Sequence, residues 1–236
     1  MKEAVEQFLK KHNYSDLNIK AVLFDMDGVL FDSMKFHATA WHEVMQSRGL
    51  NFSRHDAFMN EGRTGSSTIN EFFKKDKGRE ATQEEIEAIY ADKSKLFSSY
   101  GEVLPVEHVQ KVLQTVQSMG LEIVIVTGSG TRSLLNRLDH YFPNVFSADK
   151  MVTAFDVKIG KPDPEPYLMG LAKAGVQAHE AIVVENAPLG VRSARAAGIF
   201  TIAVNTGELT NEDLASEDAN MVLPDMHALN ELFLNL

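Results

Sequence analysis

Residues 19–28, IKAVLFDMDG, decide the fold of this chain. The apolar run from Ala21 to Phe24 has the length and bulk of a buried strand in a parallel sheet. Asp25 and Asp27 follow at its carboxyl end, where open α/β sheets bind their ligands, and the period of two puts both side chains on one side. Two acids this close repel each other unless a cation, a shared proton or phosphoryl chemistry lies between them. A plain Asp-rich turn remains the alternative.

The composition is that of a globular protein. The chain has 236 residues, 44% of them hydrophobic, which is enough for an α/β core and a second, smaller unit. It has no cysteine, which excludes disulfides, thiolate nucleophiles and cysteine-based metal sites. Its formal charge of −10 would repel a phosphate polymer, so we expect no nucleic acid partner. With no signal peptide and no segment of membrane-helix length, we expect a cytoplasmic protein without a membrane partner, and a monomer.

Hydrophobic periodicity predicts a helical block inserted after the first strand. Helical spacing starts near Ser33, and a capping box of Thr82 and Glu85 opens a long helix. From Pro105 onward, helices alternate with short apolar strands, which predicts a doubly wound parallel sheet. We therefore expect an α/β, Rossmann-like core with an inserted helical unit, divided into an N-terminal helical extension (1–17), the core (18–32 and 105–236) and the insert (33–104).

Polar residues of the types that phosphoryl transfer requires stand at or just beyond further predicted strand ends. They are Thr127, which precedes Gly128 and Ser129, then Lys161, and then the pair 185–186, Glu-Asn. Phosphoryl transfer needs a nucleophile, an acid/base, a cation and metal ligands. Taken singly, Thr127 also fits an ordinary βα turn, Lys161 a solvated loop lysine and Glu185 a polar residue at a helix N-terminus. Together with the two aspartates they favour a phosphoryl-transfer site.

The chain resembles the haloacid dehalogenase-like hydrolases in four motifs, which follow in the family's order. They are Asp25-Met26-Asp27-Gly28, Thr127, Lys161-Pro162-Asp163-Pro164 and Glu185-Asn186. The helical insert stands where that superfamily has its α-helical cap. The β-phosphoglucomutase-like branch is the most similar.

This resemblance implies a division of roles. Asp25 would attack phosphorus and form an aspartyl-phosphate, and Asp27 would serve as general acid and base. Thr127, with Gly128 and Ser129, would hold the phosphoryl oxygens, and Lys161 would neutralise their charge. Mg2+ would bind Asp25, the main-chain carbonyl of Asp27 and residue 186.

The fourth motif departs from the family, which usually has two acids there. Asn186 still offers an oxygen to Mg2+, but one negative charge is missing. Glu185 is expected to compensate, either as a ligand or by holding another ligand in place. Because that negative charge is missing, the core alone would hold the cation less firmly.

The cap also departs from the pattern of this family. His37 has the spacing seen in the mutase branch, and we expect it near Asp27 when the cap closes. Sugar-phosphate mutases of the branch have a lysine before the cap-loop glycine and an arginine soon after; here these positions are Glu61 and Gly65, and Arg63 is the remaining nearby cation for substrate. An acid facing a sugar phosphate would weaken binding. We therefore expect Glu61 to supply the carboxylate that residue 186 lacks.

The leading hypothesis is a Mg2+-dependent phosphohydrolase similar to the inorganic pyrophosphatase offshoot of this branch. Its substrate would be a small phosphate compound, pyrophosphate as its magnesium complex. One alternative is a β-phosphoglucomutase or a small sugar-phosphate phosphatase. The other is a non-catalytic phosphate-binding protein of the same fold, which would need no nucleophile at Asp25.

Overall fold

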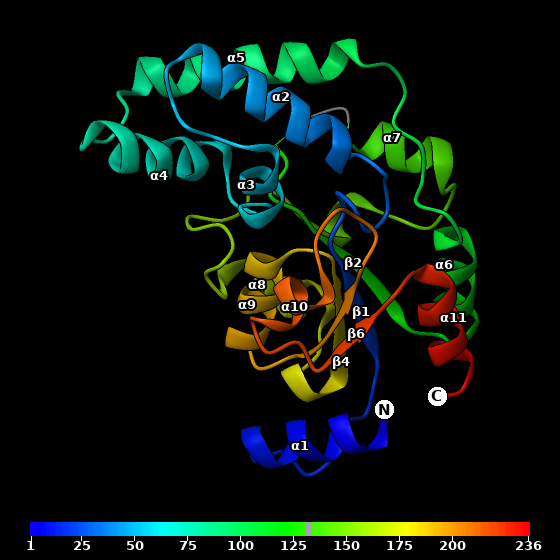
Figure 1. Cartoon of the computed structure of the whole chain (residues 1–236). Coiled ribbons are helices and arrows are strands. Elements are labelled where there is room, and N and C mark those ends of the chain that lie inside the picture. The colour runs from blue at the N-terminus through cyan, green and yellow to red at the C-terminus, as the bar shows by residue number, and fades with distance from the viewer. Residues whose placement is uncertain (131–133) are drawn as a thin grey trace.

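The computed structural model describes residues 1–130 and 134–236 and contains one parallel sheet with helices on both faces (Figure 1). Its six strands lie in the order β3-β2-β1-β4-β5-β6, and every neighbouring pair is parallel. The predicted α/β class is confirmed. The strands are β1 (Ala21–Phe24), β2 (Glu122–Val126), β3 (Met151–Val152), β4 (Ala181–Glu185), β5 (Phe200–Val204) and β6 (Met221–Leu223).

Helices connect these strands and build the insert. They are α1 (Lys2–His12), α2 (Met34–Ser47), α3 (Arg54–Met59), α4 (Gly65–Lys77), α5 (Gln83–Ser99), α6 (Val109–Ser118), α7 (Leu134–Tyr141), α8 (Glu165–Ala174), α9 (Pro188–Ala196), α10 (Asn211–Ala215) and α11 (Met226–Leu234). The predicted capping box of Thr82 and Glu85 is confirmed at the start of α5. The short helix α10 was not predicted. Within the described residues, no helix combines the length and the apolar character needed to cross a bilayer.

The central strand β1 is buried on both faces, as its uninterrupted apolar sequence predicts. Val22 and Phe24 face one hydrophobic cluster, which includes residues of α6 and α11. Ala21 and Leu23 face another, which includes residues of α8 and α9. Each fully buried large side chain contributes about 1.5–3 kcal/mol relative to an exposed one. Burial on both faces therefore fixes the position of the residues that follow β1.

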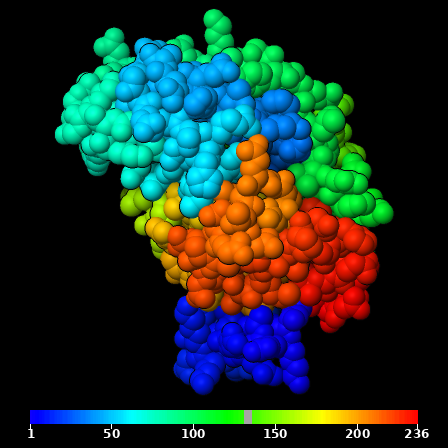
Figure 2. All heavy atoms as spheres, viewed as in Figure 1, coloured from blue at the N-terminus to red at the C-terminus, as the bar shows by residue number. Residues whose placement is uncertain are grey.

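Helices α2 to α5 lie together beyond the carboxyl ends of the strands, at the opposite end of the molecule from α1 (Figures 1 and 2). They share a hydrophobic cluster that includes Phe52, Phe72 and Ile89 and extends to Ala203 and Leu209 of the core. This apolar contact holds the insert against the core. We propose residues 33–104 as the extent of this cap.

The strand register brings the chemical residues to one edge of the sheet. Phe24 pairs with Ile125 on one side and with Val184 on the other. The next residue, Asp25, donates its main-chain N–H to the Val184 carbonyl oxygen at 3.0 Å. It therefore lies level with the end of β2 and with Glu185.

Candidate active site

A buried lysine joins the strand ends. The Nζ of Lys161 donates to Asp25 Oδ1 at 2.6 Å, to Glu185 Oε1 at 2.6 Å and to the Val126 carbonyl oxygen at 2.9 Å. Burial opposes its charge, but the two carboxylates raise its pKa. For Asp25, burial and then the charge of Glu185 outweigh the attraction of Lys161 and raise the pKa to about 8. One ammonium shared by two carboxylates leaves Asp25 in need of a second positive partner.

Glu185 is held by four donors. Its Oε1 accepts from Lys161 and from the Tyr167 hydroxyl at 2.7 Å, and its Oε2 accepts from the main-chain N–H groups of Asn186 at 3.0 Å and Ala187 at 3.4 Å. These donors use the lone pairs that a carboxylate offers. Glu185 therefore has no free lone pair for a cation, and we remove it from the proposed metal ligands. Glu185 instead fixes the position of the Lys161 ammonium group.

Asp27 belongs to a second chain of hydrogen bonds, which reaches into the cap. The Ser33 hydroxyl donates to its Oδ1 at 2.6 Å, and His37 Nε2 lies 3.3 Å from the same oxygen. Lys93 Nζ lies 2.6 Å from His37 Nδ1. An ammonium can only donate, so Nδ1 accepts and Nε2 carries the hydrogen that points to Asp27. Burial would raise the pKa of Asp27, but His37 and the bonds from His37 and Ser33 lower it to about 2.

Lys93 is a residue of this site that sequence reasoning missed. It is 6% exposed, and its Nζ lies 5.2 Å from the ring centres of both Trp41 and Phe97. Burial lowers its pKa to about 8. In the sequence it lies on an otherwise apolar face of the helix that Thr82 opens. The signal was there nonetheless, because a lysine within an otherwise apolar stripe needs a buried partner.

The cap loop and the core meet at Glu61 and Asn186, the two residues proposed from the sequence to bind the metal together. Asn186 Nδ2 donates to Glu61 Oε2 at 3.3 Å. The Asn186 amide fills the space where a side chain at Gly28 would lie, and Gly28 has a φ of 87°, so this turn requires glycine. Burial, followed by the charges of Asp25 and Asp27, raises the pKa of Glu61 well above its ordinary value.

Three buried oxygens at this meeting point have no hydrogen-bond partner among the residues that the structure describes: Asp25 Oδ2, Glu61 Oε1 and Asn186 Oδ1. A buried polar atom without a partner costs about 1–3 kcal/mol, and carboxylate and amide oxygens are ligands that Mg2+ accepts. Across residues 1–130 and 134–236, no three His, Cys, Asp or Glu side chains gather to hold a metal by themselves. The amide oxygen of Asn186 completes the set, and the three residues together fit a hard cation.

The residues predicted to hold phosphoryl oxygens border the same cavity as Asp25 and Asp27. Thr127, Gly128 and Ser129 all line it. The hydroxyl of Thr127 accepts the main-chain N–H of Ser129 at 3.0 Å, which fixes the turn after β2. This turn thus faces the two aspartates across the cavity.

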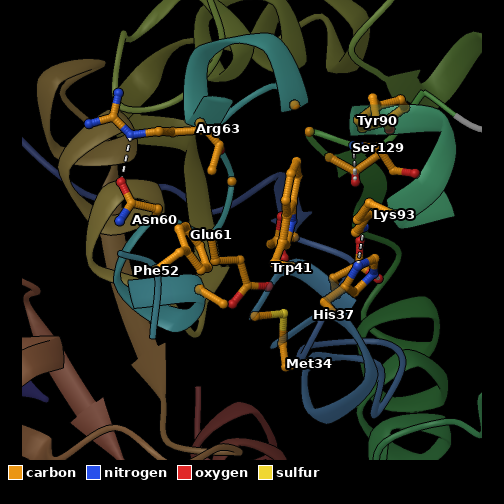
Figure 3. A pocket seen from close by; sticks show the side chains of 18 residues that line it. Met34, His37, Trp41, Phe52, Asn60, Glu61, Arg63, Tyr90, Lys93 and Ser129 are labelled. Atoms are coloured by element: carbon orange, nitrogen blue, oxygen red, sulfur yellow. Dashed lines mark hydrogen bonds and ion pairs between the residues drawn. The ribbon is translucent and has the colours of Figure 1, made fainter. Parts of the chain in front are cut away.

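Arg63 borders the cavity, but its guanidinium is directed elsewhere. Its Nε donates to Asn60 Oδ1 at 3.1 Å and its Nη1 to Ser67 Oγ at 3.3 Å, and Figure 3 shows the side chain turned away from His37 and Lys93. Glu71 lies 3.9 Å from its Nη2. Two of the five guanidinium N–H donors are thus used by Asn60 and by Ser67 of α4, and substrate binding by Arg63 stays a prediction.

The cavity is small, about 80 Å3. The cap closes it with the apolar side chains of Met34, Trp41 and Phe52 and with the ring of Tyr90 (Figure 3). A side chain at Gly65 would overlap the Tyr90 ring. The ring of Tyr90 therefore fills the space beside Gly65.

Several known proteins are similar to this chain. The family model "Haloacid dehalogenase-like hydrolase" matches residues 22–204. The solved structure "Putative beta-phosphoglucomutase from Bacteroides vulgatus" has a TM-score of 0.94 and 51% sequence identity, covering 98% of this chain and 93% of that chain. "Hexitol phosphatase A" of Escherichia coli (strain K12) is 32% identical over 80% of this chain and 84% of that protein. "Putative pyrophosphatase PpaX" of Caldanaerobacter subterraneus subsp. tengcongensis is 29% identical over 90% of this chain and 94% of that protein.

Proposed function

The chain belongs to the haloacid dehalogenase-like hydrolases, and we propose that within this family it is a Mg2+-dependent inorganic pyrophosphatase. The observation that carries the proposal is the cap carboxylate of Glu61, whose Oε2 lies 3.3 Å from Asn186 Nδ2 beside a cavity of about 80 Å3. An acid at this position favours a ligand that carries a cation over a bare sugar phosphate. Pyrophosphate with its magnesium ion has both the small size and the charge that these walls accept.

The core half of the site supports a two-step phosphoryl transfer. In the first step the Asp25 carboxylate forms a bond to phosphorus, the bridging P–O bond breaks, and phosphate leaves with a proton from Asp27. In the second step water attacks the aspartyl-phosphate, Asp27 takes its proton, and Asp25 is regenerated. The lowered pKa keeps Asp27 deprotonated, which is the form that the base of the second step requires. The negative charge of an arriving substrate raises that pKa again and lets Asp27 start as the acid.

The charge that develops on phosphorus is met by groups already in place. Lys161, held between Asp25 and Glu185, is a fixed cation at the strand ends. Thr127 and the turn behind it supply hydrogen-bond donors for the phosphoryl oxygens. These groups need no reorganisation during the reaction, because their positions are fixed by buried strands.

We propose that Asp25, Glu61 and Asn186, with the main-chain carbonyl of Asp27, hold Mg2+. When bound, the ion neutralises phosphoryl charge and orients the substrate. Glu61 reaches the ion only when the cap is closed, so closure restores the negative charge that an asparagine at position 186 removes. Cap closure and ion binding are thereby coupled.

The size of the cavity argues against large leaving groups. Pockets for drug-sized ligands measure about 300–1,000 Å3, several times the volume enclosed here. The ring of Tyr90 fills the space beside Gly65, where the sequence comparison with the mutase branch expects a basic residue for a second phosphate. A sugar-phosphate phosphatase or β-phosphoglucomutase is the second candidate, favoured by the names of the Bacteroides vulgatus and Escherichia coli relatives. A mere binding protein would need neither Asp25 nor Asp27.

The first test measures phosphate release by the purified protein with Mg2+, comparing pyrophosphate with a panel of hexose phosphates. We expect a strong preference for pyrophosphate. A preference for a hexose phosphate would leave the core roles intact and disprove the proposed substrate. Absence of turnover on every compound would favour the binding protein.

The second test changes Glu61 alone. Glu61→Gln keeps the shape and removes the charge, so we expect kcat/KM for pyrophosphate to fall about 10²-fold and the Mg2+ concentration for half-maximal rate to rise. Slow hydrolysis of monoesters should fall less. Glu71→Gln, an exposed acid on α4, is the matched control. An equal loss on every substrate would remove Glu61 from substrate selection.

A further inference from the structure

The cap loop rests on the core at three glycines, Gly62 of the loop itself, Gly128 after β2 and Gly160 before Lys161, which we call the glycine seam. A Cβ at Gly128 would lie 2.7 Å from the Gly62 carbonyl oxygen, and a Cβ at Gly62 would lie 2.8 Å from Lys161 Cδ. A Cβ at Gly160 would lie 2.8 Å from Thr64 Cγ2. Separations this short do not occur for real side chains. The loop therefore docks directly on core backbone.

The three glycines of the seam differ in what requires them. Gly62 has a φ of 85°, a conformation that favours glycine whatever surrounds it. At Gly128 the opposing atom is main chain, which cannot move aside alone. Gly160 has no positive φ, and the atom nearest to a Cβ there is a methyl carbon, Cγ2 of Thr64 at 2.8 Å, whereas the main-chain nitrogen of Thr64 lies farther away, at 3.3 Å. The contact between Gly160 and Thr64 is therefore the one whose nearest opposing atom a single substitution can remove.

Thr64 connects this contact to the site. Its hydroxyl caps α4 by accepting the main-chain N–H of Ser67, so Thr64 moves with that helix. Glu61 stands three residues before it on the same loop. A methyl group inserted at Gly160 would push Thr64 outward and carry Glu61 away from Asn186.

We propose that Gly160 and Thr64 are positioning residues that set how deeply the cap loop docks, and thereby how closely Glu61 approaches Asn186. This inference rests on the proposed function, in which that approach completes the ion site. Octahedral Mg2+ tolerates little change in ligand distance, about 0.1 Å around 2.0–2.1 Å. A displacement of about 1 Å at a reacting site can cost about 10²-fold in rate.

A second contact between cap and core provides the matched control. A Cβ at Gly207, which also lacks a positive φ, would lie 3.4 Å from the ring of Phe58 on α3, an ordinary van der Waals separation. Gly207→Ala therefore adds a methyl group at the interface between cap and core without a steric overlap. It should leave the docking depth unchanged.

The test is a double-mutant cycle on kcat/KM for pyrophosphate. Gly160→Ala should lower it about 10- to 100-fold and raise the Mg2+ requirement, whereas Thr64→Ser and Gly207→Ala should stay within about twofold. Thr64→Ser removes Cγ2 and keeps the capping hydroxyl, so adding it to Gly160→Ala should restore most of the loss. An effect passed through the backbone to Lys161 would not respond to Thr64. A loss that Thr64→Ser fails to restore, or no loss, would overturn the proposal.

A second readout needs neither turnover nor metal. Hydrogen–deuterium exchange at the main-chain amides of residues 60–65 should be faster in Gly160→Ala than in the wild type or Gly207→Ala, and should slow again in the double variant. Unchanged exchange in Gly160→Ala would disprove a docking role. If the wild type prefers hexose phosphates, the proposed function fails, but this exchange cycle still decides the role of the seam.

Discussion

The two halves of the site are built in different ways. In the core half, Asp25, Lys161 and Glu185 follow paired strands or lie against them, and direct hydrogen bonds of 2.6 Å join them. In the cap half, Glu61 and His37 each reach the core through one contact of 3.3 Å. The difference indicates that the sheet fixes the positions of the catalytic groups, whereas docking of the cap loop positions the groups that select the substrate. Changes in the core half should affect all substrates, and changes in the cap half should affect their ratio.

The largest effect is expected at the centre of the core half. Asp25→Asn should lower turnover of every substrate by at least about 10⁴-fold, because a neutral amide cannot attack phosphorus. Phosphate release on pyrophosphate and a monoester measures it. Substantial residual activity on either would remove Asp25 as the nucleophile.

Thermal unfolding of the same variant gives a control with a definite sign. The metal-free fold raises the pKa of Asp25 to about 8, so between about pH 4 and pH 8 the folded state binds more protons than the unfolded state. This contribution to stability is present at low pH and is lost as the pH rises through 8. Asp25→Asn lacks that loss, so its Tm relative to the metal-free wild type should rise with pH.

The core half was largely predictable from local sequence. A buried strand followed by Asp25, a turn with Thr127 and a strand end at Glu185 each show in a few consecutive residues, and parallel pairing then brings them together. The exception is the role of Glu185, which the sequence left open between binding the metal and holding another ligand in place. Its four donors include the hydroxyl of Tyr167, and no local pattern indicates how α8 turns that hydroxyl toward Glu185.

A smaller effect, confined to the cap half, is expected at Lys93. Lys93→Met should lower kcat/KM for pyrophosphate about 10²-fold, because His37 then loses the donor that directs its Nε2 hydrogen to Asp27. Wild-type activity should also fall as the pH rises through about 8, where Lys93 loses its proton, and the variant should lack this step. Lys95→Met, an exposed lysine on the same helix, is the control. A variant that keeps the alkaline step would assign it to another group.

The cap half was less predictable because its contacts span long separations in sequence. His37 and Lys93 are 56 residues apart, and nothing near either residue indicates the other. For Arg63 the charge suggested a substrate contact, whereas its hydrogen bonds to Asn60 and Ser67 are a feature that only the structure shows. Glu61 and His37 were singled out in advance because both stand at motif positions, Glu61 in place of a basic residue and His37 at the spacing of the mutase branch.

The third prediction changes selectivity rather than rate. Tyr90→Ala should open the cavity beside Gly65, raising kcat/KM for hexose phosphates about 10-fold while that for pyrophosphate falls a few-fold. Tyr90→Phe keeps the ring and should keep the wild-type preference. Measuring both substrates on both variants tests whether the ring sets the size limit. If Tyr90→Ala lowered the two activities equally, the cap half would contribute rate and not selectivity.

The smallest effect should come from a single hydroxyl, and it gives the sharpest test of the division between the halves. Tyr167 donates to Glu185 Oε1, the oxygen that also holds Lys161, and Lys161 Nζ lies 5.0 Å from the Tyr167 ring centre. Tyr167→Phe keeps the ring and leaves Lys161 as the only donor to that oxygen, so the ammonium is drawn toward Glu185 and shared less with Asp25. We expect kcat to fall about 3- to 10-fold, the loss of roughly one hydrogen bond.

What distinguishes this core change from a cap change is its pattern across substrates. Tyr167→Phe should lower kcat for pyrophosphate and for monoesters by the same factor, with KM and the Mg2+ requirement unchanged, because Lys161 acts on the transferring phosphoryl group that all substrates share. Steady-state kinetics on both substrates at several Mg2+ concentrations measures this. If the variant instead shifted the substrate ratio, as Glu61→Gln should, Tyr167 would influence the cap loop packed on Lys161, and the two halves would act as one unit.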